Sequence, residues 1–138
     1  MKLEMAEGPT RDQLRLLRQW NGDEAVWMVS LLKFRQQADY AEGAGERVTG
    51  RQAYARYGDA LEPIVNAGGG RLVAMGDYRG LFIGAGEADF DVITIVEFPS
   101  SGQWFDILAS EEVKAISHHR VAGLEAQLLF LAAPRASV

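Results

Sequence analysis

The chain has 138 residues and a formal net charge of −5, with 14 Lys and Arg against 19 Asp and Glu. This length is typical of one domain, which buries about two-thirds of its surface and needs no metal or disulfide to hold a core. The acidic balance argues against nucleic-acid binding, and the absence of cysteine excludes disulfides and thiolate sites. The sequence contains neither a signal peptide nor a membrane-length apolar run, so we expect a cytoplasmic protein without metal or cofactor.

The first expected elements are a helix over residues 10–20 and a strand over residues 26–34. Thr10 is a suitable N-cap for the helix, whose leucines recur at helical spacing. The strand is short, rich in β-branched and aromatic residues, and bounded by turn residues. We interpret residues 1–24 as a helical extension and residues 25–138 as a single domain.

A long loop over residues 36–48 comes next, with turn composition and little periodicity. Tyr40 lies in this loop, where it either closes over a ligand or is simply exposed. Thr49 and Gln52 have the spacing of a capping box and therefore mark the start of a helix. Three glycines at 68–70 end that helix.

The second half of the chain predicts three strands, over residues 71–78, 92–98 and 124–131. A helical region over residues 100–121 connects the last two, and Ser110 has the surroundings of a second N-cap. The order β-α-β-β-α-β is typical of the ferredoxin-like α+β fold. Right-handed crossovers then place both helices on one face of an antiparallel sheet.

Three of the strands carry apolar side chains on both faces, although the helices cover only one face. The second face needs a cover, since monomers seldom expose large apolar patches. The sheet of a second copy can cover this face completely, whereas the short leading helix, the alternative cover, can shield only part of it. We therefore expect a homodimer formed sheet to sheet. In each strand one group of apolar residues lies on one face and a second group on the other: Val26, Met28, Leu32 and Phe34 against Trp27, Val29 and Leu31; Val92, Val96 and Phe98 against Ile93 and Ile95; and Leu124, Leu128 and Phe130 against Leu129 and Leu131.

Charged residues also occur within these strands. Lys33 and Glu97 interrupt otherwise apolar faces, so each must be paired, within one subunit or across the dimer, or reach the rim. Arg35 follows the first strand and is expected to be solvated.

Candidate functional residues lie on the two crossover helices. Tyr54 and Tyr57 share the inward stripe of the first, where they are either core or a polar spot in an apolar pocket. His119 is either a surface residue near a helix end or a group that transfers protons. Arg120 either binds a ligand carboxylate or pairs with an acidic residue, Asp91 or Glu97. Adjacent His118 and His119 point about 100° apart and do not chelate one ion comfortably.

Five segments of the chain, in order, resemble the bacterial family named domain of unknown function 1330. These segments are VWMVSLLKF, VTGRQAYARYG, AGGGRLVAMGD, DVITIVEFPS and SEEVKAISHHRVAGLE. The resemblance covers about residues 25–132 and implies the dimeric α/β-barrel superfamily, whose branches include cofactor-free monooxygenases, muconolactone-type isomerases and haem-binding peroxidase-like proteins. Where relatives have Ser-Pro-Glu-Tyr, this chain has Ser110-Glu111-Glu112-Val113, so it lacks that tyrosine hydroxyl.

These observations lead to one expected function and two alternatives. The expected function is binding of a small aromatic or unsaturated acid between helices and sheet, with Arg120 on the carboxylate, Tyr54 and Tyr57 beside it, and Phe98 and Leu128 as an apolar wall. The first alternative is a cofactor-independent enzyme acting on an aromatic or carbonyl compound, in which His119 moves a proton. The second is a structural dimer without a ligand. A cavity of roughly 300 Å³ or more beside His119, Arg120 and Tyr57 would favour a binding site.

Overall fold

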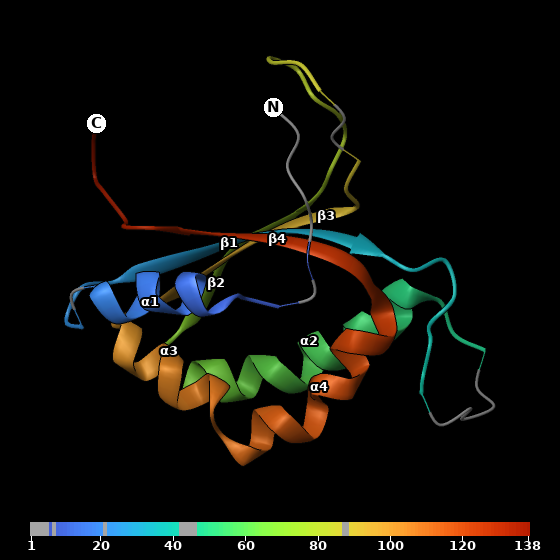
Figure 1. Cartoon of the computed structure of the whole chain (residues 1–138), viewed down its shortest axis with the longest axis horizontal. Coiled ribbons are helices and arrows are strands. Elements are labelled where there is room, and N and C mark those ends of the chain that lie inside the picture. The colour runs from blue at the N-terminus through green and yellow to red at the C-terminus, as the bar shows by residue number, and fades with distance from the viewer. Residues whose placement is uncertain (1–5, 7, 21, 42–46, 87–88) are drawn as a thin grey trace.

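One sheet and four helices make up the computed structural model (Figure 1). It describes residues 6, 8–20, 22–41, 47–86 and 89–138; residues 42–46 of the long loop therefore lie outside the described part. In chain order the elements are α1 (Arg11–Gln19), β1 (Val26–Phe34), α2 (Gly50–Ala67), β2 (Arg71–Asp77), β3 (Val92–Phe98), α3 (Ser101–Leu108), α4 (Glu111–Gly123) and β4 (Leu124–Ala132).

The sheet has the order β2-β3-β1-β4, and every neighbouring pair is antiparallel. Helix α2 connects β1 to β2, and helices α3 and α4 connect β3 to β4. This is the ferredoxin-like arrangement that the sequence predicts, and both connections lie on the same face of the sheet (Figure 1). β1 and β3 match their predicted bounds, and the second helical region restarts at Ser110, as expected.

The helices begin where polar caps satisfy their first N–H groups. Thr49 and Gln52 form a full capping box at α2, and Thr10 forms one at α1. The side chains of Ser100 and Ser110 each accept a hydrogen bond from the backbone N–H three residues later. Local sequence therefore decides these starts.

The apolar core on the helix side of the sheet is divided into two clusters. The first contains Leu17, Val26, Val65, Phe98 and Trp104, and the second contains Leu32, Val92 and Leu124. Leu17 belongs to α1, so this helix packs against the same face as α2, α3 and α4. From the sequence, the leading helix was the alternative cover for the second face of the sheet. This interpretation is wrong, because the one buried side chain of α1, Leu17, packs in the first cluster on the helix side.

The opposite face of the sheet, called the outer face below, is apolar and no described element covers it. None of its large side chains is buried, in contrast to Val26, Leu32 and Phe98 on the helix side. The register of the strands places these residues on it: Trp27, Val29, Leu31, Ile93, Ile95, Leu128 and Phe130.

One expected face assignment is wrong. The sequence pattern groups Leu124 with Leu128, but Leu124 is buried on the helix side while Leu128 lies on the outer face opposite Leu31. The cause is a register shift between Lys33 and Phe34, which inserts one extra residue in β4. A shift of one residue moves a side chain to the other face.

A glycine contact joins the start of α2 to the end of α4. A Cβ atom on Gly50 would lie 2.6 Å from the carbonyl oxygen of Gly123, and one on Gly123 would lie 2.5 Å from the carbonyl oxygen of Gly50. Arg35 bridges the same point, because its N–H donates to Gly123 and its carbonyl accepts from Gly50. Only glycine permits this approach of the backbones.

Candidate functional site

A band of polar groups lies between the two core clusters. Arg120 on α4 donates to the side-chain oxygen of Gln127 on β4 at 2.6 Å, and the Gln127 amide donates to the Ser30 hydroxyl at 3.2 Å. Ser30 is buried on the helix side of β1 and is paired in register with buried Thr94. Polar side chains thus interrupt the core at the middle of the sheet. We call Arg120, Gln127, Ser30, Tyr54 and Tyr57 the polar band.

The two tyrosines of the band come from the inward face of α2. Their ring centroids are 5.6 Å apart, and the Tyr54 ring is 5.4 Å from that of Phe34. Burial raises the pKa of Tyr54 to about 12, with a further rise from Tyr57 and an opposing effect of the Arg120 charge. Burial also raises the pKa of Tyr57, again against Arg120. Both phenols are therefore neutral near pH 7, and within the described part of the chain neither hydroxyl has a hydrogen-bond partner.

The band is closed in this conformation. The hollow beside Arg120 has a volume of about 10 Å³ and is lined by Ala6, Val121, Leu124 and Ala126. This is about the space of one water molecule. This hollow is therefore far smaller than the roughly 300 Å³ that would favour a binding site, and a larger ligand requires side chains to move there.

His119 lies in a different cluster from the tyrosine pair. Its Nδ1 is 2.7 Å from the hydroxyl of Tyr40, which also accepts a hydrogen bond of 3.4 Å from Arg56. Desolvation lowers the pKa of His119, and the charges of His118 and Arg56 lower it further. A neutral imidazole accepts at Nδ1, so we assign the Tyr40 hydroxyl as the donor. Tyr40 is thus held on α4 and α2 rather than exposed.

Two predicted wall residues lie away from the band. Phe98 is buried in the first core cluster opposite Val26, whereas Tyr54 packs on Phe34 at the other end of β1, roughly 25 Å along the strand. Leu128 lies on the outer face opposite Leu31, separated from the band by the sheet itself. The sequence places both on strands correctly, but the distance and the face keep them from forming one wall with Arg120.

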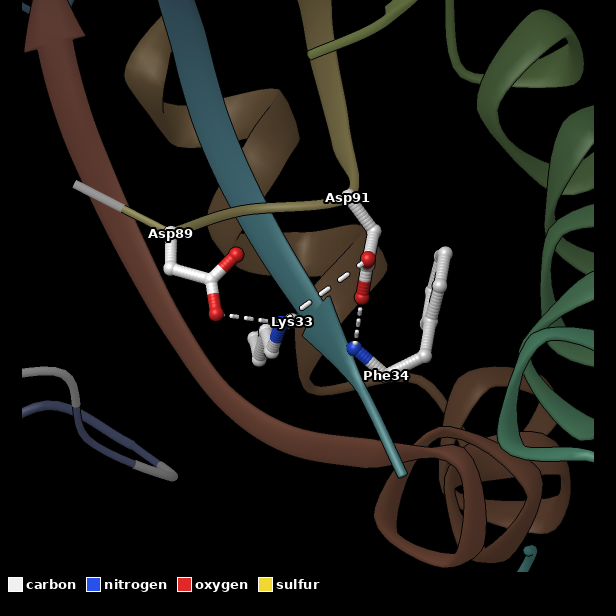
Figure 2. A network of polar contacts seen from close by, with 4 residues as sticks. All are labelled: Lys33, Phe34, Asp89 and Asp91. Atoms are coloured by element: carbon white, nitrogen blue, oxygen red, sulfur yellow. Dashed lines mark hydrogen bonds and ion pairs between the residues drawn. The ribbon is translucent and has the colours of Figure 1, made fainter. Parts of the chain in front are cut away.

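The charged strand residues are paired within the subunit. Lys33 contacts Asp89 at 2.9 Å and Asp91 at 4.0 Å, while the Phe34 ring lies on the opposite side of β1, toward α2 (Figure 2). The hydrogen bond to Asp89 is the main cause of the raised pKa of Lys33. Asp91 also accepts a hydrogen bond of 2.7 Å from the N–H of Phe34.

Glu97 is held at the other end of β3. Its carboxylate accepts from Trp27 Nε1 at 2.9 Å and from Arg71 Nε at 3.0 Å. These two hydrogen bonds lower the pKa of Glu97, that of Trp27 most. Arg120 therefore has Gln127, rather than Glu97, as its partner in the described structure.

A second hollow, not predicted from the sequence, opens at the end of β1. It has a volume of about 470 Å³, and we call it the β1 groove. Arg35, expected to be solvated, lines it with an inaccessible Nε. No local pattern identifies it, since the groove forms only when β1, α2 and β4 meet. Its lining consists of Lys33, Phe34, Arg35, Gln36, Thr49, Arg51, Asp91 and Glu125.

The described residues form neither a metal-binding cluster nor a membrane-spanning helix. No group of three or more His, Asp or Glu side chains is placed to hold a metal ion there. No helix of the described part is both long and apolar enough to span a membrane.

Comparison with known proteins identifies the family. A protein of unknown function from Rhodopseudomonas palustris is 25% identical, with 94% of this chain and 97% of that chain covered at a TM-score of 0.84. The structure of the methylated form of that protein is 26% identical; the match covers 96% of this chain and 97% of that chain, and its TM-score is 0.85. A dabb family protein with a ferredoxin-like fold from Mesorhizobium loti is 13% identical; the match covers 82% of this chain and 99% of that chain, and its TM-score is 0.48. No curated protein matches the sequence.

The family described as domain of unknown function (DUF1330) matches residues 40–134. This is well over half of the chain and includes α2, all of β2 to β4, and every residue of the polar band except Ser30. It follows that the chain belongs to the DUF1330 family.

Proposed function

We propose that this protein is a homodimer that binds a small organic acid in its polar band. The observation that carries the proposal is the divided core: a guanidinium and two largely buried tyrosines stand between two apolar clusters. A domain of this size ordinarily has one continuous core. Polar groups within a core are costly unless they are satisfied, so a band of them is a place where a polar ligand can add hydrogen bonds.

The chemistry of the band suits a carboxylate. Arg120 currently donates to a neutral amide oxygen of Gln127. A ligand carboxylate is a stronger acceptor, since charge-assisted hydrogen bonds are about twice as strong as neutral ones. Rotation of the Gln127 side chain frees Arg120 for this exchange. The neutral hydroxyls of Tyr54 and Tyr57 then donate to the bound acid, and the clusters on either side take its apolar part.

The geometry favours binding over proton transfer. His119, the imidazole considered for catalysis, contacts Tyr40 and Arg56 and has no contact with the tyrosine pair among the described residues. The raised pKa of Tyr54, about 12, leaves it protonated near pH 7 and makes it a donor rather than a base. Among the described residues, neither His119 nor Tyr54 therefore supports a proton transfer at Arg120.

The outer face supports the homodimer. Seven large apolar side chains on β1, β3 and β4 are partly exposed there, and patches beyond a few hundred Å² ordinarily mark interfaces. The connection from β2 to β3 rises from the sheet on the side away from α2 and α4 (Figure 1). Phe82 and Ile83, on this connection, are 95% and 84% exposed. A second copy packed on the outer face covers both features.

Titration calorimetry with benzoate and sorbate tests the acid site. Arg120→Gln should weaken binding by about tenfold to a hundredfold, because it removes a charge-assisted hydrogen bond. Tyr57→Phe should weaken binding by a smaller factor, and Arg79→Gln, on the exposed connection, should leave binding unchanged. Benzamide, which has the ring without the charge, should not bind.

The controls separate the alternatives. Thermal melts of each variant show whether the fold is intact. If neither acid binds the wild-type protein, or if Arg120→Gln binds as tightly as wild type, the acid-binding proposal is wrong and the structural dimer without a ligand replaces it.

A further inference from the structure

The β1 groove is an open site at the end of the sheet, distinct from the closed polar band. It is built where β1 ends, α2 begins and β4 starts, and its volume of about 470 Å³ is enough for a small organic molecule. Phe34 separates the two sites, since its ring faces Tyr54 at 5.4 Å and Arg51 at 5.1 Å.

Arg35 is the unexplained group in this groove. Its Nε is inaccessible and has no hydrogen-bond partner, and no ion pair involves its guanidinium within the described residues. The backbone around it is fixed, because its N–H donates to Gly123 at 2.8 Å and its carbonyl accepts from Gly50 at 3.1 Å. An unpaired N–H of a charged group in such a place is costly. A fixed backbone thus holds a residue with an unsatisfied Nε–H in the lining of an open groove.

The neighbouring charges leave Arg35 available for a ligand. Lys33 is held by Asp89 at 2.9 Å, and Asp91 is held by the N–H of Phe34 at 2.7 Å. Arg51 lies over the Phe34 ring and is 3.5 Å from Asp77, but it is more than half exposed. Arg51 is therefore free to turn toward the groove at little cost. Glu125, the other acidic residue of the lining, is exposed on β4.

We propose that the β1 groove binds the oxyanion of a small molecule, a carboxylate or a phosphate, through the guanidinium of Arg35. The two terminal N–H groups of Arg35, which are not enclosed as its Nε is, donate side by side to two oxygens of the anion, which is the bidentate geometry that guanidinium favours. Arg51 closes over the bound group from the mouth, and the Phe34 ring forms the apolar floor. This site does not depend on Arg120 or on the acid-binding proposal above.

The test follows the Arg35 Nε–H signal in a ¹H–¹⁵N spectrum during titration with sodium acetate and, separately, inorganic phosphate. Ionic strength is kept constant with sodium chloride, and the signal is assigned by its loss in Arg35→Lys. A saturable shift with either anion supports the proposal, and the anion that binds more tightly identifies the class of headgroup. Arg35→Lys should weaken binding by about tenfold, because lysine keeps the charge but lacks the paired donors.

Two matched variants make the result decisive. Arg120→Gln should bind the anion as wild type does, since it lies in the other site. Arg51→Gln should weaken binding several-fold, and it remains informative if Arg35→Lys fails to fold. A shift that is linear and equal to that with chloride alone would overturn the proposal. Unchanged affinity in Arg35→Lys or in Arg51→Gln, measured by the other signals of the groove, would also overturn it.

Discussion

The hydroxyl of Tyr40 lies 2.7 Å from Nδ1 of His119, and this contact attaches the loop after β1 to helix α4. The imidazole is 79 residues away along the chain, and the ring centroids are 5.6 Å apart in an edge-to-face arrangement. Because Arg56 donates to the same hydroxyl oxygen, the Tyr40 proton points to His119. With this assignment, Nδ1 of His119 accepts the hydrogen bond, as a neutral imidazole can.

The neutral state of His119 predicts a pH dependence of stability. Its folded pKa is lowered from 6.5, chiefly by desolvation, so the unfolded chain binds a proton at a higher pH than the folded chain does. Stability is then complete above about pH 6.5 and falls as the pH decreases from there toward the folded value. Urea unfolding at steps between pH 7.5 and 5 measures this, and His119→Gln should remove this part of the slope. An unchanged slope in His119→Gln would contradict the assignment.

The glycine contact between α2 and α4 predicts opposite effects of two similar substitutions. Gly123→Ala should lower the free energy of unfolding by about 1–3 kcal/mol, because the new methyl group meets backbone atoms of Gly50 and Tyr54. Gly58→Ala, on the same α2 helix, meets no atom within 4 Å and should raise it by about 0.5–1 kcal/mol. Denaturant unfolding measures both. Equal effects of the two substitutions would show that the close contact does not form.

The outer face predicts a subunit interface. Val29→Glu should produce monomers or unfolded protein, since an unpaired charge is not tolerated inside an apolar interface. Phe82→Ser should weaken association while the fold is retained, because Phe82 is almost fully exposed in one subunit. Leu16→Glu, at an exposed position of α1, is the control and should leave the mass unchanged. Light scattering across a dilution series reports the result; a wild-type mass of 15.2 kDa at micromolar concentration would contradict the dimer.

The two hydrogen bonds to Glu97 predict a change in its titration. Trp27→Phe removes the donor that lowers the pKa of Glu97 most, so this pKa should rise toward its usual value while Arg71 still holds it below. Carboxyl ¹³C shifts followed against pH measure the change. Because the folded pKa of Glu97 is lowered, its stabilising effect is present above the usual pKa of 4.5 and is lost as the pH falls through the folded value. A Glu97 pKa that does not move in Trp27→Phe would contradict the contact.

Most of the fold follows from local sequence. Short runs of β-branched and aromatic residues between turn residues predict the bounds of β1 and β3 to the residue, and Thr10, Thr49, Ser100 and Ser110 mark the helix starts, because both signals are short-range. The two-faced strands also indicate an outer face that needs a cover. A register shift of one residue is not visible in such patterns, and it is this shift that separates Leu124 from Leu128.

The site was harder to predict than the fold. Sequence spacing places Tyr54, Tyr57 and Arg120 on the inward side of their helices, and the structure brings these three together. His119 follows a different direction because one residue turns a helix by about 100°. Arg35 was missed, since its burial arises from three elements that meet only in the folded chain. Long-range packing decides each of these positions.

The most direct test of acid binding in the polar band is a ¹H–¹⁵N amide map of benzoate binding, recorded in Arg35→Lys so that the β1 groove contributes less. The account predicts saturable shifts centred on Ser30, Tyr57 and Gln127, on the helix side of the sheet. Saturable shifts confined to the outer face, or no saturable shift at all, would contradict it.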